Sequence, residues 1–317
     1  MYCPHAARRW LPPPAASQER ESLRHMNLIA SIPSPSSGIV HLGPLTIHMY
    51  GLMLLLGIVA CVWLTGIRWV RMGGDWDLIF RVAVWGVGFG IVGARLYHDI
   101  TSWSEVPDPK WKGIFEVWKG GLGVWGGIAL GVVVGAIVVR RSGNSVRLMM
   151  DAVAPGLLLA QGIGRWGNWW NQELYGKHTD LPWALEIHGK DASHLYHPTF
   201  LYEFIWDILG VAVLLWVDRR FKIRRPGLFA LYVSWYTAFR TYEETLRIDP
   251  SSHLWGQRLN FWVSLVCFIA STAFFIWWQF LRGREPGEAR PVRARRTKPQ
   301  PVPKAPAMAI PRRRGRR

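Results

Sequence analysis

The sequence has few cysteines, and none of them stands in a pattern that supports cysteine chemistry. Of the three cysteines, Cys61 and Cys267 lie inside apolar runs and Cys3 lies in a polar leader. This placement argues against a disulfide framework and against a metal site. No Cys–His or Ser–His pair is positioned to suggest a covalent intermediate on this chain. We therefore expect neither a metal nor a cofactor.

Charged residues are also scarce, at 19% of the 317 residues, whereas half of the residues are hydrophobic. A membrane-spanning helix needs roughly 20 apolar residues. Leu45–Ile67 and Leu259–Leu281 contain no Asp, Glu, Lys or Arg. The sequence therefore predicts an all-α polytopic membrane protein with about seven transmembrane helices. The five remaining predicted spans are Leu78–His98, Leu122–Val139, Ala152–Trp170, Thr199–Val217 and Gly227–Arg247.

The net charge of +17 is concentrated in two places. Residues 282–317 contain 13 Lys and Arg against two acidic residues, and the loop 218–226 adds five bases and one acid. A seven-span topology puts both segments on one side of the membrane, which the positive-inside rule makes cytoplasmic. This predicts an N-terminus outside and a C-terminus in the cytoplasm. It argues against nucleic acid as a partner, and it favours contact of the tail with anionic membrane lipid.

The chain divides into three parts by composition. Residues 1–31 are interpreted as a disordered leader, because they lack the apolar core of a signal peptide and Met26 resembles a natural start. Residues 32–281 form the seven-span domain, with a small extracytoplasmic segment at 171–198. Residues 282–317, rich in Pro and Arg, are interpreted as a disordered basic cytoplasmic tail.

The alternating directions of the helices bring polar residues from distant parts of the sequence to one depth, the outer third of the bilayer. On a helix, Arg165, Asn168 and Gln172 share a face. A guanidinium with amide neighbours suits a phosphate, which it can bind through paired donors. The alternative is that Arg165 pairs with Glu173 or Glu244 only to hold helices together, since charges inside membranes often pair.

Four motifs then carry a resemblance to a known family. GRWGNWWNQELYG (164–176) resembles the signature of the prolipoprotein diacylglyceryl transferases, with Trp169 in place of a phenylalanine. HLGPLTIHMYGL (41–52), YHPTFLYE (196–203) and YTAFRTYEETLR (236–247) resemble three further family segments in the same order. The resemblance covers about residues 32–281 and leaves only the two termini outside.

This resemblance implies a transferase. Its members move the diacylglyceryl group of phosphatidylglycerol to the lipobox cysteine of a preprolipoprotein, form a thioether and release glycerol phosphate. The active site would face the outer leaflet. Motif positions and predicted depth together suggest as catalytic residues Arg165, Arg240, Glu173, Glu244, Tyr50 and His197. The predicted substrate-binding residues are Arg165, Asn168, Asn171, Tyr236, Tyr202, Glu203, Arg95, Arg247 and Trp125.

The base that accepts the thiol proton stays open at this point. Many relatives have a histidine in the third span, but the matching position here is Trp125. The remaining candidates are Glu173, Glu244, His197 and His48. His197 could equally order its loop and begin the next span. Asp207 is interpreted as a packing residue, and Asp151 as an acid that complements a helix dipole.

Two other classes of protein fit parts of the sequence. A lipid transporter or scramblase could hold arginines in a helix bundle, but such proteins usually show an internal repeat and polar groups at the midplane. A noncatalytic scaffold that binds signal peptides would not need so many converging arginines and carboxylates. A measurement of lipid transfer to a lipobox peptide discriminates between the transferase and these two alternatives.

Overall fold

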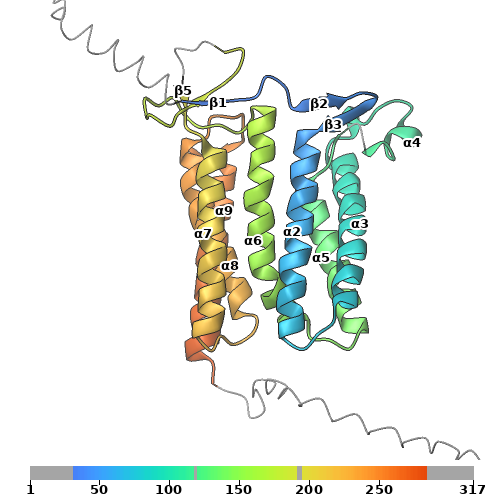
Figure 1. Ribbon diagram of the computed structural model, residues 1–317, viewed down its shortest axis with the longest axis vertical. Helices are drawn as coiled ribbons and strands as arrows, with labels where there is room; N and C mark the ends of the chain where they lie inside the picture. The colour runs from blue at the N-terminus through green and yellow to red at the C-terminus, as the bar shows by residue number, and fades with distance from the viewer. Residues whose placement is uncertain (1–30, 118–119, 191–194, 284–317) are drawn as a thin grey trace, which may run out of the picture. The chain divides into compact units, whose positions relative to one another are not determined.

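The computed structural model describes residues 31–117, 120–190 and 195–283, so the predicted leader before Ser31 and the tail after Gly283 lie outside the described residues. The described part of the chain contains seven long helices, which alternate in direction (Figure 1). Their bounds are α2 Met49–Arg71, α3 Trp76–Thr101, α5 Val124–Arg141, α6 Val146–Asn171, α7 Thr199–Arg220, α8 Gly227–Leu246 and α9 Leu259–Ile276, which the π-helical turn η3 (Trp277–Leu281) continues.

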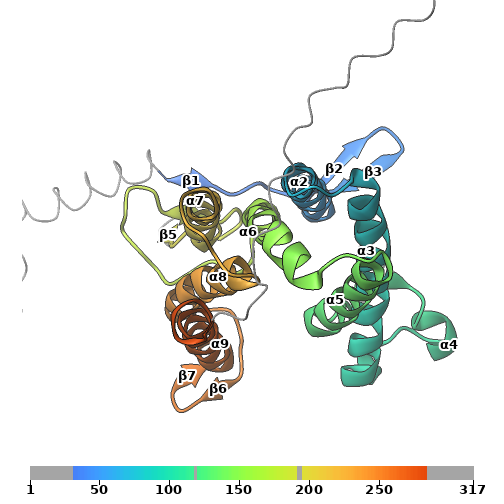
Figure 2. The ribbon, with the colours of Figure 1, turned by 90° about the horizontal axis from the view of Figure 1, so that it is seen from below.

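Six of these helices are long and apolar enough to cross a membrane, which makes the chain a multi-pass membrane protein. Their outward apolar side chains, such as Leu55, Val84 and Val132, remain exposed, as contact with lipid requires. The seventh, α8, which corresponds to the predicted span Gly227–Arg247, is more polar than the other six because it carries Arg240 and two glutamates. It packs against α6, α7 and α9 and so belongs to the bundle (Figure 2).

The first predicted span begins earlier in the chain than the helix that the structure shows. We expected a helix from Leu45, but Leu45–His48 forms strand β3, which pairs antiparallel with β2 (Ile39–Leu42). Gly43 adopts a φ of 60° in the turn between them, a conformation that glycine reaches without steric cost. The apolar run is therefore shared between a hairpin and a helix, and α2 begins only at Met49.

Short strands gather at one end of the helix bundle, which we call the sheet end (Figure 1). One three-stranded sheet orders the segment after α6, because β1 pairs parallel with β4 and β4 pairs antiparallel with β5. The α3–α5 connection lies at the same end and contains two short helical turns. The remaining bounds are β1 Ile32–Pro33, β4 Leu185–Glu186, β5 Leu195–Tyr196, β6 His253–Leu254, β7 Gln257–Arg258, η1 Trp103–Glu105 and α4 Lys110–Gly113.

The other end, which we call the basic end, carries a buried ion pair. The Arg68 guanidinium lies 3.3 Å from Asp218 and donates hydrogen bonds of 2.9 Å to the carbonyls of Asp151 and Ala152. The Asp151 carboxylate accepts the backbone N–H of Phe229 at 2.9 Å. Asp151 therefore accepts a free backbone N–H in the first turn of α8 rather than one in its own helix. Together these contacts join α2, α6, α7 and α8.

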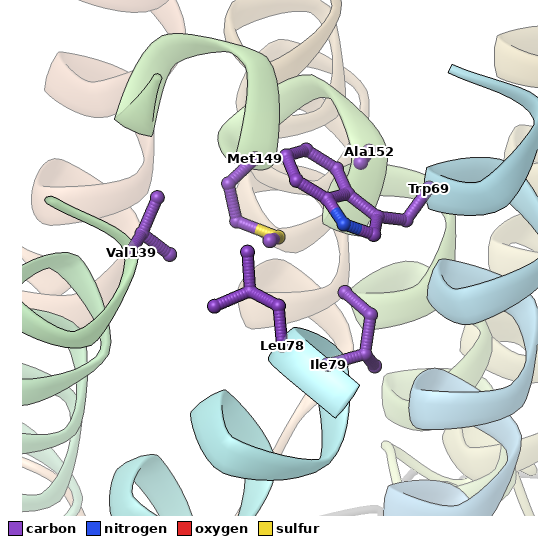
Figure 3. Packing of buried hydrophobic residues seen from close by; sticks show 6 residues of the cluster. All are labelled: Trp69, Leu78, Ile79, Val139, Met149 and Ala152. Atoms are coloured by element: carbon purple, nitrogen blue, oxygen red, sulfur yellow. The ribbon is translucent and has the colours of Figure 1, made fainter. Parts of the chain in front are cut away.

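A small apolar core lies beside this ion pair. Figure 3 shows the Trp69 indole packed with Leu78, Ile79 and Met149, and these side chains come from three different helices. Each of the two turns at this end leads into a capped helix. The Asp75 side chain accepts the backbone N–H of Leu78 at the start of α3, and the Ser145 side chain accepts that of Leu148 at the start of α6. Apolar packing and capping thus fix the basic end.

Glycines determine how closely α3 and α5 approach. A Cβ added to Gly93 would lie 2.4 Å from the carbonyl oxygen of Gly126, and one added to Gly126 would lie 2.2 Å from that of Gly93. Only glycine fits at such a crossing, and small residues of this kind are the usual means by which membrane helices pack tightly. A Cβ on Gly88 of the same helix would meet no atom within 4 Å.

We predict that Gly93→Ala destabilises the protein by roughly 1–3 kcal/mol, because the helices must separate to admit one methyl group. Gly88→Ala serves as the matched control, and its effect should be neutral or slightly stabilising because alanine is the better helix former. Thermal unfolding of the purified proteins in one detergent measures both. Equal melting temperatures for the two variants would contradict the close crossing.

Candidate active site

The last turns of α6 bring Arg165 and Asn168 to the sheet end of the bundle. Glycines around them open space for two neighbouring helices. A Cβ on Gly162 would lie 3.1 Å from Cβ of Asp207 on α7, and one on Gly167 would lie 2.7 Å from the ring of Tyr50 on α2. The glycines of the motif therefore let α2 and α7 approach α6, as expected for small residues between membrane helices.

Arg165 and Arg240 meet at one carboxylate, that of Glu203, and we call these three residues the two-arginine site. Arg165 Nη2 lies 2.7 Å from Glu203 Oε1, and Arg240 Nη1 lies 3.7 Å from Oε2. The Glu203 side chain is 1% exposed, whereas those of Arg165 and Arg240 are 19% and 14% exposed. Each guanidinium therefore keeps an accessible part beside a buried counter-charge.

Polar neighbours orient the Arg165 guanidinium. It donates to Asn168 Oδ1 at 3.2 Å and to the Tyr236 hydroxyl at 3.4 Å. Asn168 in turn donates to Glu173 Oε1 at 2.9 Å. Arg165 does pair with a glutamate, but its partner is Glu203 rather than Glu173 or Glu244.

Glu244 is the centre of a second group of ion pairs. It binds Arg240 from its own helix, and it lies 3.4 Å from Arg247 and 2.6 Å from Arg258. Asp249 completes the group, at 2.7 Å from Arg247 and 2.8 Å from Arg258. Burial alone would raise the pKa of Asp249, but hydrogen bonds from the two arginines outweigh it and lower that pKa. This group fixes the end of α8 against the start of α9.

The end of α6 also borders a cavity of about 530 Å³, which we call the outer pocket. Its walls are residues 36–39, the start of α2 and the last residues of α6. Asn171, His48 and Tyr50 line it. The ring of Tyr50 also lies beside Gly167, so this side chain connects the outer pocket with the turn of α6 that carries Asn168.

Two predicted substrate-binding residues lie in the α3–α5 region instead. Arg95 donates to the backbone carbonyls of Ile114, Gly113, Gly120 and Gly121 and lies 3.2 Å from Asp99. These contacts hold the α3–α5 connection to the end of α3. Trp125 begins α5 with its side chain 59% exposed. None of the contacts of Arg95 reaches α6, α7 or α8 among the described residues.

His197 lies in the ordered segment before α7. Its Nδ1 is 3.1 Å from the Tyr202 hydroxyl, which also accepts the Trp183 indole N–H at 3.1 Å. Its backbone pairs with Gly176 and Lys177. Burial and the nearby Lys177 lower the pKa of His197. These contacts agree with the alternative in which His197 orders its loop and begins α7, although its catalytic role stays a prediction.

The sequence analysis missed several residues of the charged groups. Glu243 binds Arg240, and Arg258 binds Glu244 from the strand before α9. Asp207 is fully buried one turn below Glu203, and neither of its oxygens has a hydrogen-bond partner among the described residues. Glu243 is adjacent to a motif residue and could have been found, whereas Arg258 ends the short strand β7, where no sequence pattern marks it.

Comparison with known proteins shows the family of the chain. The family described as "Prolipoprotein diacylglyceryl transferase" matches residues 37–277. The phosphatidylglycerol–prolipoprotein diacylglyceryl transferase of Streptomyces griseus is 49% identical over 258 residues, which cover 79% of this chain and 78% of that protein. The proteins of the same name from Frankia alni (47% identity; 78% and 68% covered) and Rhodococcus jostii (42%; 84% and 79%) are also similar. The resemblance predicted from the motifs is confirmed, and the chain belongs to the prolipoprotein diacylglyceryl transferase family.

Proposed function

We propose that this protein transfers the diacylglyceryl group of phosphatidylglycerol to the lipobox cysteine of a prolipoprotein. The names of its relatives state the lipid donor and the prolipoprotein acceptor. The observation that carries the proposal is the two-arginine site, in which Arg165 and Arg240 from separate helices share one buried carboxylate and keep accessible edges. Paired guanidiniums of this kind suit the phosphate of a lipid headgroup.

The reaction forms a carbon–sulfur bond and breaks a carbon–oxygen bond. The cysteine sulfur attacks the glyceryl carbon that carries the phosphate ester, and the bonding electron pair leaves with the phosphate oxygen. Negative charge grows on that oxygen in the transition state, where Arg165 and Arg240 stabilise it. The thiol proton passes to a base of the protein and then to the released glycerol phosphate or to water.

Among the candidate bases, the contacts favour Glu173. Three arginines bind Glu244, so both of its carboxylate oxygens are engaged in ion pairs. Glu173 is exposed and forms no ion pair within the described residues. It accepts a hydrogen bond from Asn168, which also contacts Arg165. Glu173 is therefore placed beside the two-arginine site without being neutralised by it.

The proposed orientation puts the sheet end outside the cytoplasm. Basic residues end three helices at the opposite end, and the positive-inside rule assigns that end to the cytoplasm. The active site then faces the outer leaflet of the bacterial inner membrane, where the prolipoprotein cysteine emerges. The basic tail after Gly283 is proposed to contact anionic lipid. The basic residues at the helix ends are Arg68 and Arg71 of α2, Arg140 and Arg141 of α5, and Arg219 and Arg220 of α7.

The direct test is transfer of labelled diacylglyceryl from phosphatidylglycerol to a lipobox peptide by the purified protein in vesicles. The labelled product must survive hydroxylamine, because a thioether resists it and a thioester does not. Phosphatidylcholine vesicles provide the control for the donor. Lipid movement across the vesicle membrane without a labelled peptide would favour the scramblase alternative.

We predict that Arg165→Lys loses at least about 99% of transfer activity and still folds. Lysine keeps the charge but loses the planar fork that can hold Asn168, Glu203 and a phosphate together. The matched control is Arg81→Lys on the exposed side of α3, where Arg81 forms an ion pair with Asp77 at 3.1 Å. Initial rates at saturating lipid measure both, and wild-type rates for Arg165→Lys would exclude the phosphate clamp.

We further predict opposite effects of two glutamate variants. Glu173→Gln should lower kcat by about 100-fold with an unchanged melting temperature, since a general base typically contributes 10²–10⁴-fold. Glu244→Gln should destabilise the protein by about 3–5 kcal/mol, because it leaves the buried Arg247 and Arg258 and the partly buried Arg240 underpaired. Melting temperature and kcat per folded molecule separate these effects. A stable, inactive Glu244→Gln variant beside an active Glu173→Gln variant would reverse the assignment.

A further inference from the structure

The outer pocket is built into the fold rather than left between loops. The carbonyl of Gly38 accepts the N–H of Met49 at 2.9 Å, which ties the loop 36–39 to the start of α2. The Gln172 side chain donates to the carbonyl of Pro35, and the Trp169 indole donates to that of Pro33 at 3.2 Å. Both ends of this wall are therefore fixed to helices.

The wall also approaches α6 closely at Gly38. A Cβ on Gly38 would lie 2.7 Å from Asn171 Oδ1 and 3.3 Å from the carbonyl oxygen of Trp170. β1 then continues the same segment into the sheet with β4. The shape of the pocket is consequently set before any ligand enters, which favours binding.

The chemistry of the lining differs from that of the two-arginine site. None of the ten residues that line the outer pocket is Lys, Arg, Asp or Glu. The lining offers hydroxyl, amide and imidazole groups from Ser36, Ser37, His48 and Asn171, beside the apolar surfaces of Ile39 and Trp170. A phosphate would find no cation there. An uncharged chain of peptide groups with small side chains matches both the hydrogen-bonding groups and the apolar walls.

The position of the pocket connects it to the reacting groups. Tyr50 lines the pocket and also packs on Gly167, which lies between Arg165 and Asn168 in the chain. Asn168 holds Glu173, the favoured base. A peptide lying in the pocket could thus place a cysteine thiol at Tyr50, between the base and the phosphate-binding guanidiniums.

We propose that the outer pocket binds the acceptor peptide around its cysteine, while the two-arginine site holds the lipid phosphate. This inference rests on the proposed function, because it assigns the second substrate of the same reaction. It also explains why the two sites differ in charge. The pocket receives a neutral acceptor, and the arginines receive an anionic donor.

Gly51 provides the decisive test. It lines the pocket, and a Cβ at this position meets no atom within 4 Å, so a larger side chain fills the pocket without displacing its walls. We expect Gly51→Leu to raise KM for a lipobox peptide by about tenfold or more, with KM for phosphatidylglycerol within about twofold of wild type. The matched control is Gly88→Leu on α3, which is equally open and outside the pocket, and it should change neither constant.

Two outcomes overturn the proposal. An increase in KM for phosphatidylglycerol alone would assign the pocket to the lipid headgroup. Unchanged constants for both substrates would exclude it from binding either one. Monodisperse elution and an unchanged melting temperature establish that the Gly51→Leu variant is folded.

A binding measurement separates failure of this inference from failure of the proposed function. A peptide with serine in place of the cysteine cannot be modified, so its capture needs no turnover. A photo-crosslinking residue at Ile39, 38% exposed on β2, should capture this peptide. The same residue at Leu254, 41% exposed on β6 at the same end, should not. Equal capture at both positions, or none at Ile39, contradicts the pocket assignment even if transfer itself is demonstrated.

Discussion

The carboxylate of Glu203 is the group on which the two-arginine site depends. It is buried, and an unpaired charge at this depth in a membrane bundle would cost several kcal/mol. Its partners come from two other helices, Arg165 from α6 and Arg240 from α8. The ion pairs therefore form only when α6, α7 and α8 lie together. Gly162 and Gly210 permit that packing, because a Cβ at either position would meet side chains of neighbouring helices.

The arginines at the two ends of the bundle have different kinds of partner. At the basic end, each of the three guanidinium nitrogens of Arg68 contacts the protein, through Asp218 and two backbone carbonyls. Arg95 is likewise held by carbonyls in the α3–α5 connection. At the two-arginine site the partners are side chains, and both guanidiniums stay partly accessible. A structural arginine and a ligand-binding arginine thus differ in their partners more than in their depth.

The sequence predicted the helices well, but it did not predict which charged side chains form ion pairs. Apolar runs located seven long helices, and the four motifs located the family, because both signals are local in the chain. The partner of Arg165 was missed, since Glu203 is 38 positions away and only the packing of α7 on α6 brings it near. Arg95 was placed at the right depth, but depth does not specify which side of the bundle a residue faces. The hairpin before α2 was hidden because its strand is as apolar as a helix.

The separation of charge between the two sites follows from the proposed chemistry. A free thiol titrates near ~8.5, so an acceptor arrives neutral at physiological pH. A thiolate formed early would be repelled by the lipid phosphate, and one formed far from a cation would be poorly stabilised. Both difficulties are avoided if the thiol loses its proton only beside Arg165. Asn168 contacts both Arg165 and Glu173, so the proposed base and the cation are held by one side chain beside the outer pocket.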